Sequence, residues 1–304
     1  MADVRVGIVS WNTAALLERC LQSLPAALGG LDAEVVVVDN ASSDASADVA
    51  ARRPGVRVVR MSSNVGYARA MNVALAGTEA PVLAAINPDT ELPPDSLAIL
   101  VGRVRQPGVG LVVPQLTNSD GTMQRSVYRF PSLRVTALAQ LLPRWSDPAP
   151  TRPGPVDWAI GAVHVMNTAA LGGQPPYSER WFMYTEDIEL CWRLQERGWS
   201  VRLEPDVQVL HVGNASGAQA WGTGREERYM RGVYDFDART RGRMHARALA
   251  AVLVVGTIWR WLINRLRRGG PGNLRRVLSV HVQTLFHGPP APERSSPGDR
   301  GANG

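Results

Sequence analysis

The chain has 304 residues, of which 45% are hydrophobic, and a formal net charge of +6; these values are typical of a globular protein with one large or two small domains. Its two cysteines, Cys20 and Cys191, exclude a disulfide framework and favour a reducing compartment. The sequence holds neither a Gly-x-Gly-x-x-Gly fingerprint nor a Gly-Lys-Ser/Thr loop, which excludes the common dinucleotide-binding and P-loop classes.

Strands and helices alternate along the first half of the chain. Runs rich in Val, Ile and Ala predict buried strands at residues 4–9, 34–38, 56–60, 80–86 and 108–113. Helical patterns lie between them, and we expect the first helix to begin after Thr13 and to end at Pro25. The alternation predicts an α/β fold with a mostly parallel central sheet, in which ligands bind at the carboxyl ends of the strands.

Carboxylates follow two of these predicted strands. Asp39 closes the strand at 34–38 and is suited to accept hydrogen bonds from the base or ribose of a nucleotide. Asp89 follows the strand at 80–86 between prolines, and such a rigidly held carboxylate is suited to bind Mg²⁺ or Mn²⁺. Asp44 is equally well explained as the N-cap of the next helix.

A second group of carboxylates opens a predicted helix near residue 186. Glu186, Asp187 and Glu189 fall in its first turn, beside aromatic residues, and Gly198 marks its end. Acidic residues in a first turn also stabilise an ordinary surface helix through the helix dipole. The alternative is a general base, since an apolar surrounding raises the pKa of a carboxylate and strengthens it as a base.

Four segments in a fixed order resemble the family 2 glycosyltransferases: VVVVDNASSDAS at 35–46, NVGY at 64–67, NPDT at 87–90 and TEDIELCWR at 185–193. The chain is most similar to the rhamnosyltransferase-like branch, which builds bacterial cell-surface glycans. The resemblance covers roughly residues 4–216. It implies the GT-A fold, a Rossmann-like sheet flanked by helices, and hexosyltransferase activity.

The resemblance also implies roles for individual residues. Asp187 matches the base that deprotonates the acceptor hydroxyl, which implies inversion at the anomeric carbon. Asp89 and His211 match the ligands of an Mg²⁺ or Mn²⁺ ion, although a lone His after a strand is more often structural. The first acid of the family's Asp-x-Asp motif is replaced by Asn87, which leaves one direct carboxylate ligand. The implied nucleotide-sugar-binding residues are Ser10, Asn12, Asp39, Asn64, Gly66, Asn87 and Asp89.

The acceptor side is implied less directly. The segment VDWAIGA at 156–162 matches a family segment that lines the acceptor pocket, although Trp158 is as well explained as a core residue. Glu186 and Glu189 are candidates to bind acceptor hydroxyls or to remain surface acids. The acceptor candidates are therefore Asp157, Trp158, Gly161, Glu186 and Glu189. Residues 143–155, rich in Pro, are expected to form a mobile loop.

The domain organisation follows from these segments. We expect a glycosyltransferase domain at 1–220, with a nucleotide-binding half at 1–114 and an acceptor half at 115–220. A basic and apolar helical extension at 221–287 and a disordered tail at 288–304 follow. The uncharged run at 248–259 is too short to span a membrane, and its Arg and Trp neighbours suit a helix lying on an anionic membrane surface. The alternative is a helix that packs on protein.

These observations predict an inverting, metal-dependent glycosyltransferase that moves a sugar, with dTDP-rhamnose as the first candidate donor, to a polyprenyl-diphosphate-linked precursor of a cell-surface glycan. Another donor sugar, a soluble acceptor and a non-catalytic nucleotide-sugar-binding protein are the alternatives. No signal peptide is recognised, so we expect a cytoplasmic protein, peripheral at the inner face of the membrane. No nucleic-acid partner is expected, because aromatic stacking positions are not evident.

Overall fold

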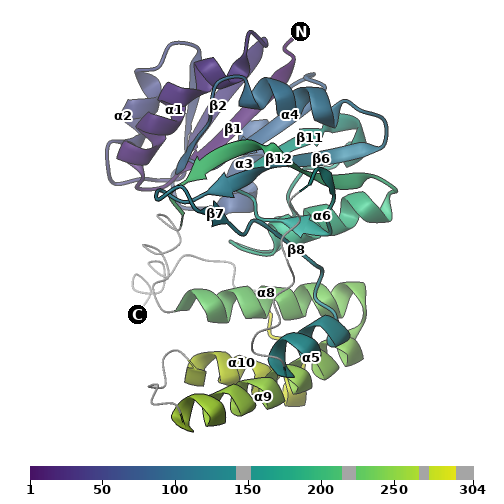
Figure 1. Ribbon diagram of the computed structural model, residues 1–304. Helices are drawn as coiled ribbons and strands as arrows, with labels where there is room; N and C mark the ends of the chain where they lie inside the picture. Colours follow the sequence, from purple (N-terminus) through teal and green to yellow (C-terminus); the bar gives the residue numbers. More distant parts are fainter. Residues whose placement is uncertain (142–151, 214–223, 267–273, 292–304) are drawn as a thin grey trace. The chain divides into compact units, whose positions relative to one another are not determined.

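The structure, a computed structural model, describes residues 1–141, 152–213, 224–266 and 274–291. The described residues form two compact units, one built on a sheet and one made of helices (Figure 1). The predicted tail beyond residue 291 and most of the predicted loop at 143–155 lie outside the described residues.

The sheet unit contains ten strands in one sheet. Their order is β3-β2-β1-β4-β11-β6-β12-β5, with β7 paired to β6 and β9 paired to β12. The strands are β1 (Val4–Ser10), β2 (Ala33–Asp39), β3 (Val56–Arg60), β4 (Val82–Ile86), β5 (Thr90–Glu91), β6 (Val109–Thr117), β7 (Met123–Gln124), β9 (Gly154–Pro155), β11 (Val163–Asn167) and β12 (Ser200–His211). A separate small sheet pairs β8 (Val127–Tyr128) with β10 (Trp158–Ala159).

The direction of the strands divides the sheet into two parts. The four strands β3, β2, β1 and β4 are mutually parallel. β11 enters antiparallel between β4 and β6, and β12 then runs parallel to β6. The predicted α/β class with a central sheet flanked by helices is confirmed.

Helices cover both faces of this sheet (Figure 1). On one face lie α1 (Ala14–Leu28), α2 (Ser46–Ala51) and α4 (Ser96–Val104). On the other lie α3 (Tyr67–Leu75), the 3₁₀ helix η1 (Thr168–Leu171) and α6 (Glu186–Glu196). The core between α1, α4 and the sheet contains fully buried side chains such as Ile8, Leu17 and Leu100. Burial of this apolar surface drives the layers together.

The expected end of the first helix at Pro25 is wrong. Pro25 lies inside α1, which continues to Leu28 and ends where Gly29 adopts a left-handed φ of 54°. The apolar face extends past the proline, because Leu24 and Ala27 are both buried in the core. Packing of that last turn therefore outweighs the hydrogen bond that a helical proline removes.

The helical unit consists of α5 (Leu133–Leu141), α8 (Arg225–Thr240), α9 (Arg243–Leu266) and α10 (Leu274–His287), and α9 contacts the other three. A Cβ on Gly256 of α9 would overlap the side chain of Gln140 in α5, so the glycine permits a close approach of these two helices. Among the described residues, no helix is both long enough and apolar enough to cross a membrane.

Candidate active site

The pairing of β5 with β12 brings Asp89 and His211, which are far apart in the sequence, together near the carboxyl ends of β4 and β12. His211, the last residue of β12, pairs with Thr90, and Val212 donates its backbone N–H to the carbonyl of Asp89 (2.9 Å). Asp89 follows β4, which pairs in parallel with β1, and β1 pairs in parallel with β2; β1 and β2 end at the paired residues Ser10 and Asp39. The sheet therefore collects the predicted nucleotide and metal residues along one edge.

The side chains of Asp89 and His211 face each other, and each presents an atom that can bind a metal ion. His211 Nε2 lies 3.4 Å from Asp89 Oδ1, which is buried and accepts no hydrogen bond. Gln124 Oε1 lies 2.7 Å from His211 Nδ1, and this contact places the imidazole proton on Nδ1 and leaves the Nε2 lone pair toward Asp89. A carboxylate oxygen facing an imidazole lone pair suits a cation between them, and both atoms are ligands that Mn²⁺ and Mg²⁺ accept.

The sequence did not single out Gln124, because it lies on β7, far along the chain from His211. Among the described residues, no group of three or more His, Cys, Asp or Glu side chains could hold a metal ion. A metal at the pair formed by Asp89 and His211 would therefore complete its coordination with water and substrate oxygens.

The loops after β1 and β2 hold one another through side chains. Asn12 Oδ1 accepts from the Ser43 backbone N–H (2.7 Å), and the Ser10 and Thr13 hydroxyls are 2.8 Å apart. Asp39 Oδ2 accepts from the Ser42 N–H (3.3 Å), whereas Asp39 Oδ1 is buried without a hydrogen-bond partner. The loops thus leave one carboxylate oxygen of Asp39 open to a ligand.

Asp44 acts as a helix cap. Its Oδ2 accepts from the backbone N–H of Ala14, the first residue of α1, and its Oδ1 accepts from the N–H of Ser46 (2.9 Å each). Asp44 therefore satisfies backbone N–H groups at the starts of α1 and α2, but the N-cap residue of α2 is Ala45, so the predicted N-cap position is wrong by one residue.

The start of α3 is built against the segment before α6. Asn64 Oδ1 accepts from the Asn40 side chain (2.9 Å) and from the Gly66 N–H (3.0 Å). Gly66 has a φ of 85°, and a Cβ there would overlap the carbonyl oxygen of Phe182, which accepts the Tyr67 N–H (2.9 Å). The predicted residues Asn64 and Gly66 therefore shape the turn that touches the Phe182 backbone.

Glu186 is buried and Asp187 is partly buried at the start of α6, after two residues with positive φ (Tyr184, 69°; Thr185, 80°). Burial raises the pKa of Asp187, and the backbone N–H of Ile188, which donates to the carboxylate (2.8 Å), opposes part of the rise. Burial and the charge of Asp187 raise the pKa of Glu186 further. Because the charge of Asp187 adds to the effect of burial at Glu186, Glu186 is the member of the pair that more strongly favours the protonated form.

The turn at 160–162 connects Asp187 to the loop after β4. The Asn87 N–H donates to the Ala162 carbonyl (2.8 Å). Gly161 lies against Asp187, because a Cβ added to the glycine would be 3.8 Å from the Cβ of the aspartate. The base candidate and the loop that carries Asp89 therefore flank the same turn.

The other predicted acceptor residues have partners within the protein. Trp158 is buried, stacks on Tyr128 with ring centroids 4.8 Å apart, and donates its indole N–H to the Arg129 carbonyl (3.0 Å). The carbonyl of Asp157 accepts from the Gln195 side chain (2.6 Å). Trp158 therefore has the environment of a core residue.

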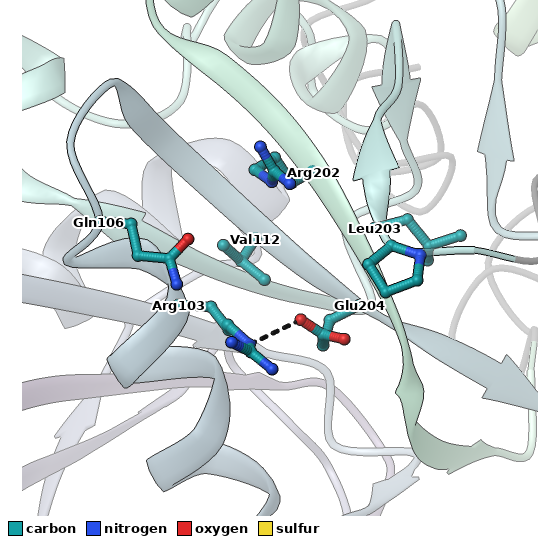
Figure 2. Close-up of a pocket in the computed structure, with 7 residues that line it drawn as sticks. Arg103, Gln106, Val112, Arg202, Leu203 and Glu204 are labelled. Carbon is teal, nitrogen blue, oxygen red and sulfur yellow. Dashed lines mark ion pairs between the residues drawn. The ribbon is translucent and has the colours of Figure 1, made fainter.

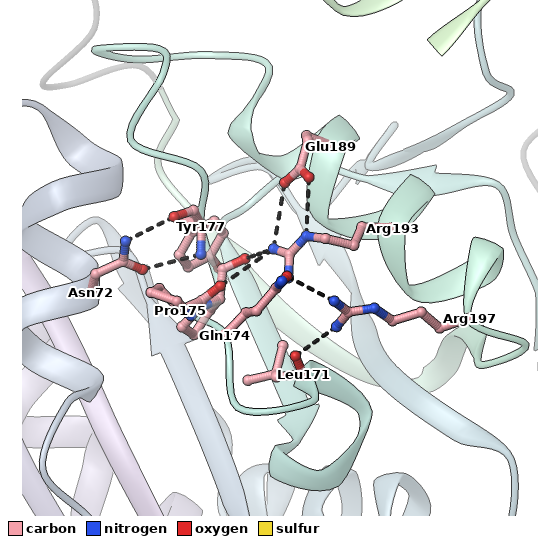
Figure 3. A network of polar contacts seen from close by, with 9 residues as sticks. Asn72, Leu171, Gln174, Pro175, Tyr177, Glu189, Arg193 and Arg197 are labelled. Carbon is pink, nitrogen blue, oxygen red and sulfur yellow. Dashed lines mark hydrogen bonds and ion pairs between the residues drawn. The ribbon is translucent and has the colours of Figure 1, made fainter. Parts of the chain in front are cut away.

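Glu189 faces Arg193, which belongs to a network that the sequence did not reveal (Figure 3). Glu189 Oε1 lies 3.0 Å from Arg193 Nε, and the same arginine donates to the carbonyls of Pro175 and Pro176. Arg197 donates to the Leu171 carbonyl (2.6 Å) and to Gln174 Oε1 (2.7 Å). Arg193 of α6 and Arg197, which follows the last residue of the helix, thus hold the segment 171–176.

A surface pocket elsewhere on the sheet unit contains none of the predicted site residues (Figure 2). Its walls carry an ion pair between Arg103 Nε and Glu204 Oε2 (2.9 Å). The lining residues are Arg103, Gln106, Val112, Pro153, Arg202, Leu203 and Glu204. The candidate active site is therefore the edge at the carboxyl ends of the strands, and not this pocket.

Two sequence families match the chain. Residues 5–148 match the family described as Glycosyl transferase family 2, and residues 83–284 match Glycosyl transferase family group 2. A protein of Mycobacterium tuberculosis named N-acetylglucosaminyl-diphospho-decaprenol L-rhamnosyltransferase is 33% identical over 237 residues, which cover 69% of this chain and 76% of that protein. The pre-mycofactocin glycosyltransferase of the same organism is 30% identical over 214 residues, covering 69% of this chain and 42% of the relative.

Solved structures share the fold. A mannosyltransferase of Pyrobaculum calidifontis, in complex with GDP-Man and Mn²⁺, superposes with a TM-score of 0.58 and 17% identity, covering 94% of this chain and 88% of the other. TarS of S. aureus superposes with a TM-score of 0.53 and 15% identity, covering 83% of this chain and 43% of that one.

Proposed function

The chain belongs to glycosyl transferase family 2 and is a hexosyltransferase with the GT-A fold, and we propose that it transfers a sugar with inversion from a nucleotide-diphosphate donor to a lipid-linked acceptor. The observation that carries the proposed chemistry is the position of Asp187. It is a partly buried carboxylate with a raised pKa, and it flanks the turn that is hydrogen-bonded to the loop carrying Asp89. A base on one side and a diphosphate site on the other are what a direct displacement needs.

The ionised Asp187 carboxylate accepts the proton of the acceptor hydroxyl while that oxygen forms a bond to the anomeric carbon. The bond from the anomeric carbon to the diphosphate oxygen breaks, and its electron pair leaves with the nucleoside diphosphate. Protonated Glu186 donates a hydrogen bond to an acceptor oxygen. Its Oε2 atom has no partner within the described protein, which supports this role.

The diphosphate is held at the edge formed by Asn87, Asp89 and His211. A divalent cation held between Asp89 and His211 would neutralise the negative charge that grows on the leaving diphosphate. Asp39, with its unpartnered Oδ1, and the loop residues Ser10 and Asn12 bind the nucleoside. Asn64 and Gly66 shape the adjoining turn. The acceptor would bind on the side of the site that contains Asp157, Trp158, Gly161 and Glu189.

The relative that is named for L-rhamnosyl transfer to N-acetylglucosaminyl-diphospho-decaprenol supports the choice of substrates. We therefore propose dTDP-rhamnose as donor and a polyprenyl-diphosphate-linked sugar as acceptor, in the biogenesis of a cell-surface glycan. A soluble acceptor is the second candidate, since another relative, similar over the same share of this chain, is named for pre-mycofactocin and not for a lipid-linked sugar. The family and its relatives are enzymes, so a non-catalytic role is not retained.

The test is a donor panel of dTDP-, UDP- and GDP-sugars with Mn²⁺ or Mg²⁺, with and without a synthetic polyprenyl-diphosphate N-acetylglucosamine. We expect nucleoside diphosphate release from dTDP-rhamnose only when the lipid acceptor is present, and a product of inverted anomeric configuration by NMR. Asp187→Asn should reduce turnover by at least about 100-fold while donor binding persists. The control Asp206→Asn removes an exposed carboxylate of β12 and should retain full turnover.

Turnover by Asp187→Asn at the wild-type rate would refute the base assignment. Transfer to a soluble acceptor without lipid would favour the second candidate.

We also propose that α9 lies on an anionic membrane surface, as a peripheral enzyme with a lipid-linked substrate requires. Four apolar side chains on α9 are 43–63% exposed and recur at a spacing of three, four and seven residues, which places them on one helix face. They are Val255, Ile258, Trp259 and Leu262. An apolar helix face with basic residues along the same helix is suited to the interface of a bilayer.

Vesicle sedimentation tests this surface. Ile258→Glu should weaken binding to anionic vesicles at least about fivefold, because a charge would then enter the apolar boundary of the bilayer. The matched control is Ile99→Glu on α4, since Ile99 is 45% exposed and Ile258 is 43% exposed. Equal binding by the two variants would show that α9 does not contact the membrane.

A further inference from the structure

We propose that Arg125 binds the diphosphate group of the lipid-linked acceptor and so selects acceptors that carry a diphosphate. The inference rests on the proposed function, which supplies the class of acceptor, and extends it to a residue to which neither the sequence pattern nor the similarity to relatives assigns a role. Three features of Arg125 support it: its position in the chain, the aromatic ring that holds its guanidinium, and the charge of its surroundings.

Arg125 directly follows a residue that contacts the proposed metal pair. Gln124 Oε1 lies 2.7 Å from His211 Nδ1. Gln124 also pairs with Leu116 of β6, which fixes this end of the segment to the sheet. The backbone of Arg125 therefore starts beside the edge at which the donor diphosphate is proposed to bind.

The next residue, Ser126, is bonded to the turn beside the proposed base. Its backbone carbonyl accepts from the N–H of Ile160 (2.9 Å), and Ile160 precedes Gly161, which lies against Asp187. In an acceptor of the proposed class, one sugar ring carries both the reacting hydroxyl and the diphosphate. A cation for this diphosphate is thus expected close to the base without touching it, and the position of Arg125 fits this expectation.

The side chain of Arg125 extends toward the proposed acceptor side. Its Cζ lies over the ring of Tyr128, 4.8 Å from the ring centroid, and the Tyr128 hydroxyl donates to the Arg125 carbonyl (3.0 Å). The ring of Tyr128 stacks in turn on Trp158, in the segment 156–162 that is proposed to line the acceptor side. The guanidinium therefore lies over β8 and β10, and it is not directed back along the chain to Gln124.

The aromatic ring holds the guanidinium without neutralising its charge. A guanidinium over an aromatic face is attracted by the ring, and its N–H donors remain able to bind two phosphate oxygens at once. Arg125 is exposed, and no carboxylate of the described residues forms an ion pair with it. It is thus a cation that is held in place and still has donors for an anionic ligand.

The surroundings of Arg125 make such a cation necessary for a diphosphate acceptor. Asp89 and Asp187 lie on the two elements that the segment around Arg125 contacts through its neighbours. A diphosphate that approaches these carboxylates is repelled, and a nearby cation without a carboxylate partner offsets the repulsion.

The test compares two acceptors that differ in the diphosphate alone. One is N-acetylglucosamine linked through a diphosphate to farnesol, and the other is N-acetylglucosamine linked directly to farnesol. Their binding is measured by titration calorimetry with excess dTDP and Mn²⁺, which occupy the proposed donor site. Wild type should bind the diphosphate acceptor at least about tenfold more tightly. Arg125→Gln should remove this preference, and Arg125→Lys should keep part of it, because lysine has the charge without the planar fork.

The matched control is Arg57→Gln. It removes the same charge from an exposed arginine of β3, the strand at the other end of the sheet order, and should keep the full preference. Loss of the preference in Arg57→Gln, or equally weakened binding of both acceptors in Arg125→Gln, would overturn the inference.

Two further arms separate the other sources of phosphate. The affinity for dTDP-rhamnose and the sedimentation with anionic vesicles should both be unchanged in Arg125→Gln. Weaker binding of dTDP-rhamnose or of vesicles, with the acceptor preference intact, would overturn the inference in favour of the donor diphosphate or a lipid headgroup. The calorimetry needs no turnover, so a donor panel without transfer would refute the proposed reaction and would still leave the role of Arg125 to be decided by binding.

Discussion

Gly66→Ala is the sharpest test of how the nucleotide side of the site is joined to the catalytic segment. Gly66 has φ 85° and ψ 166°, a region that side-chain-bearing residues avoid at a cost of about 1–2 kcal/mol. A Cβ at this position would also overlap the Phe182 carbonyl oxygen, and relieving such an overlap costs about 1–3 kcal/mol more. The expected loss in the free energy of unfolding is therefore about 2–5 kcal/mol.

The control for Gly66→Ala separates backbone strain from overlap. Gly55 also has a positive φ, 76°, but a Cβ there has no neighbour within 4 Å. Gly55→Ala should thus lose only the strain energy of about 1 kcal/mol. Urea unfolding followed by circular dichroism gives both losses, and equal losses in the two variants would refute the argument from Phe182. Because Phe182 precedes the base by five residues, Gly66→Ala should also reduce turnover about tenfold, whereas Gly55→Ala should not.

Two further predictions concern the titratable groups. Burial raises the pKa of Glu186 above its unfolded value, so the folded state binds the extra proton and the stability contributed by Glu186 is lost as pH rises from about 4.5 toward the folded value. Glu186→Gln removes this dependence. Between pH 5 and 8, the unfolding free energy of the variant relative to wild type should rise by at least about 1 kcal/mol, as measured by urea titration. If the difference in unfolding free energy between variant and wild type did not change with pH, the effect of burial on Glu186 would be contradicted. For the proposed metal pair, His211→Ala should weaken Mn²⁺ binding, measured by electron paramagnetic resonance, by about 100-fold, and Gln124→Ala by about tenfold, because Gln124 only orients the imidazole. Equal Mn²⁺ affinity in wild type and His211→Ala would refute the metal role.

The sequence predicted the parallel half of the sheet well because its strands are short runs rich in Val, Ile and Ala. β1, β2, β3 and β4 were all anticipated within one or two residues of their bounds. The second half was harder to predict. β12 continues through Pro205, which interrupts the strand pattern, because the irregular pairing between Glu204 and Gln208 accommodates it. Helix α5 was not anticipated at all.

In the candidate site, too, some residues can be found from the local sequence pattern, whereas others are recognised only from contacts between distant parts of the chain. Asp39, Asp89, Asp187 and His211 sit at strand or helix ends, and a local pattern is enough to find such positions. Gln124 and Tyr67 make contacts that join distant parts of the chain, and no spacing rule on a single sequence reveals such contacts. A role for Asp44 at a helix start was anticipated, but neither the N-cap residue of α2, which is Ala45, nor the bond from Ala14, 30 residues away, was.

The position of Asp187 is determined by backbone geometry more than by its own side chain. Tyr184 and Thr185 both adopt positive φ immediately before α6, which is costly for a tyrosine and more so for a β-branched threonine. That strain persists only because the surrounding contacts fix the segment: the Phe182 carbonyl accepts the Tyr67 N–H, and the first turn of α6 is buried. The same contacts partly withdraw the carboxyl of Asp187, the proposed base, from water and so raise its pKa. The backbone strain, the burial and the raised pKa of Asp187 thus all result from packing α3 against the segment that precedes α6. A change that relaxes this segment would lower the pKa of Asp187 together with the strain.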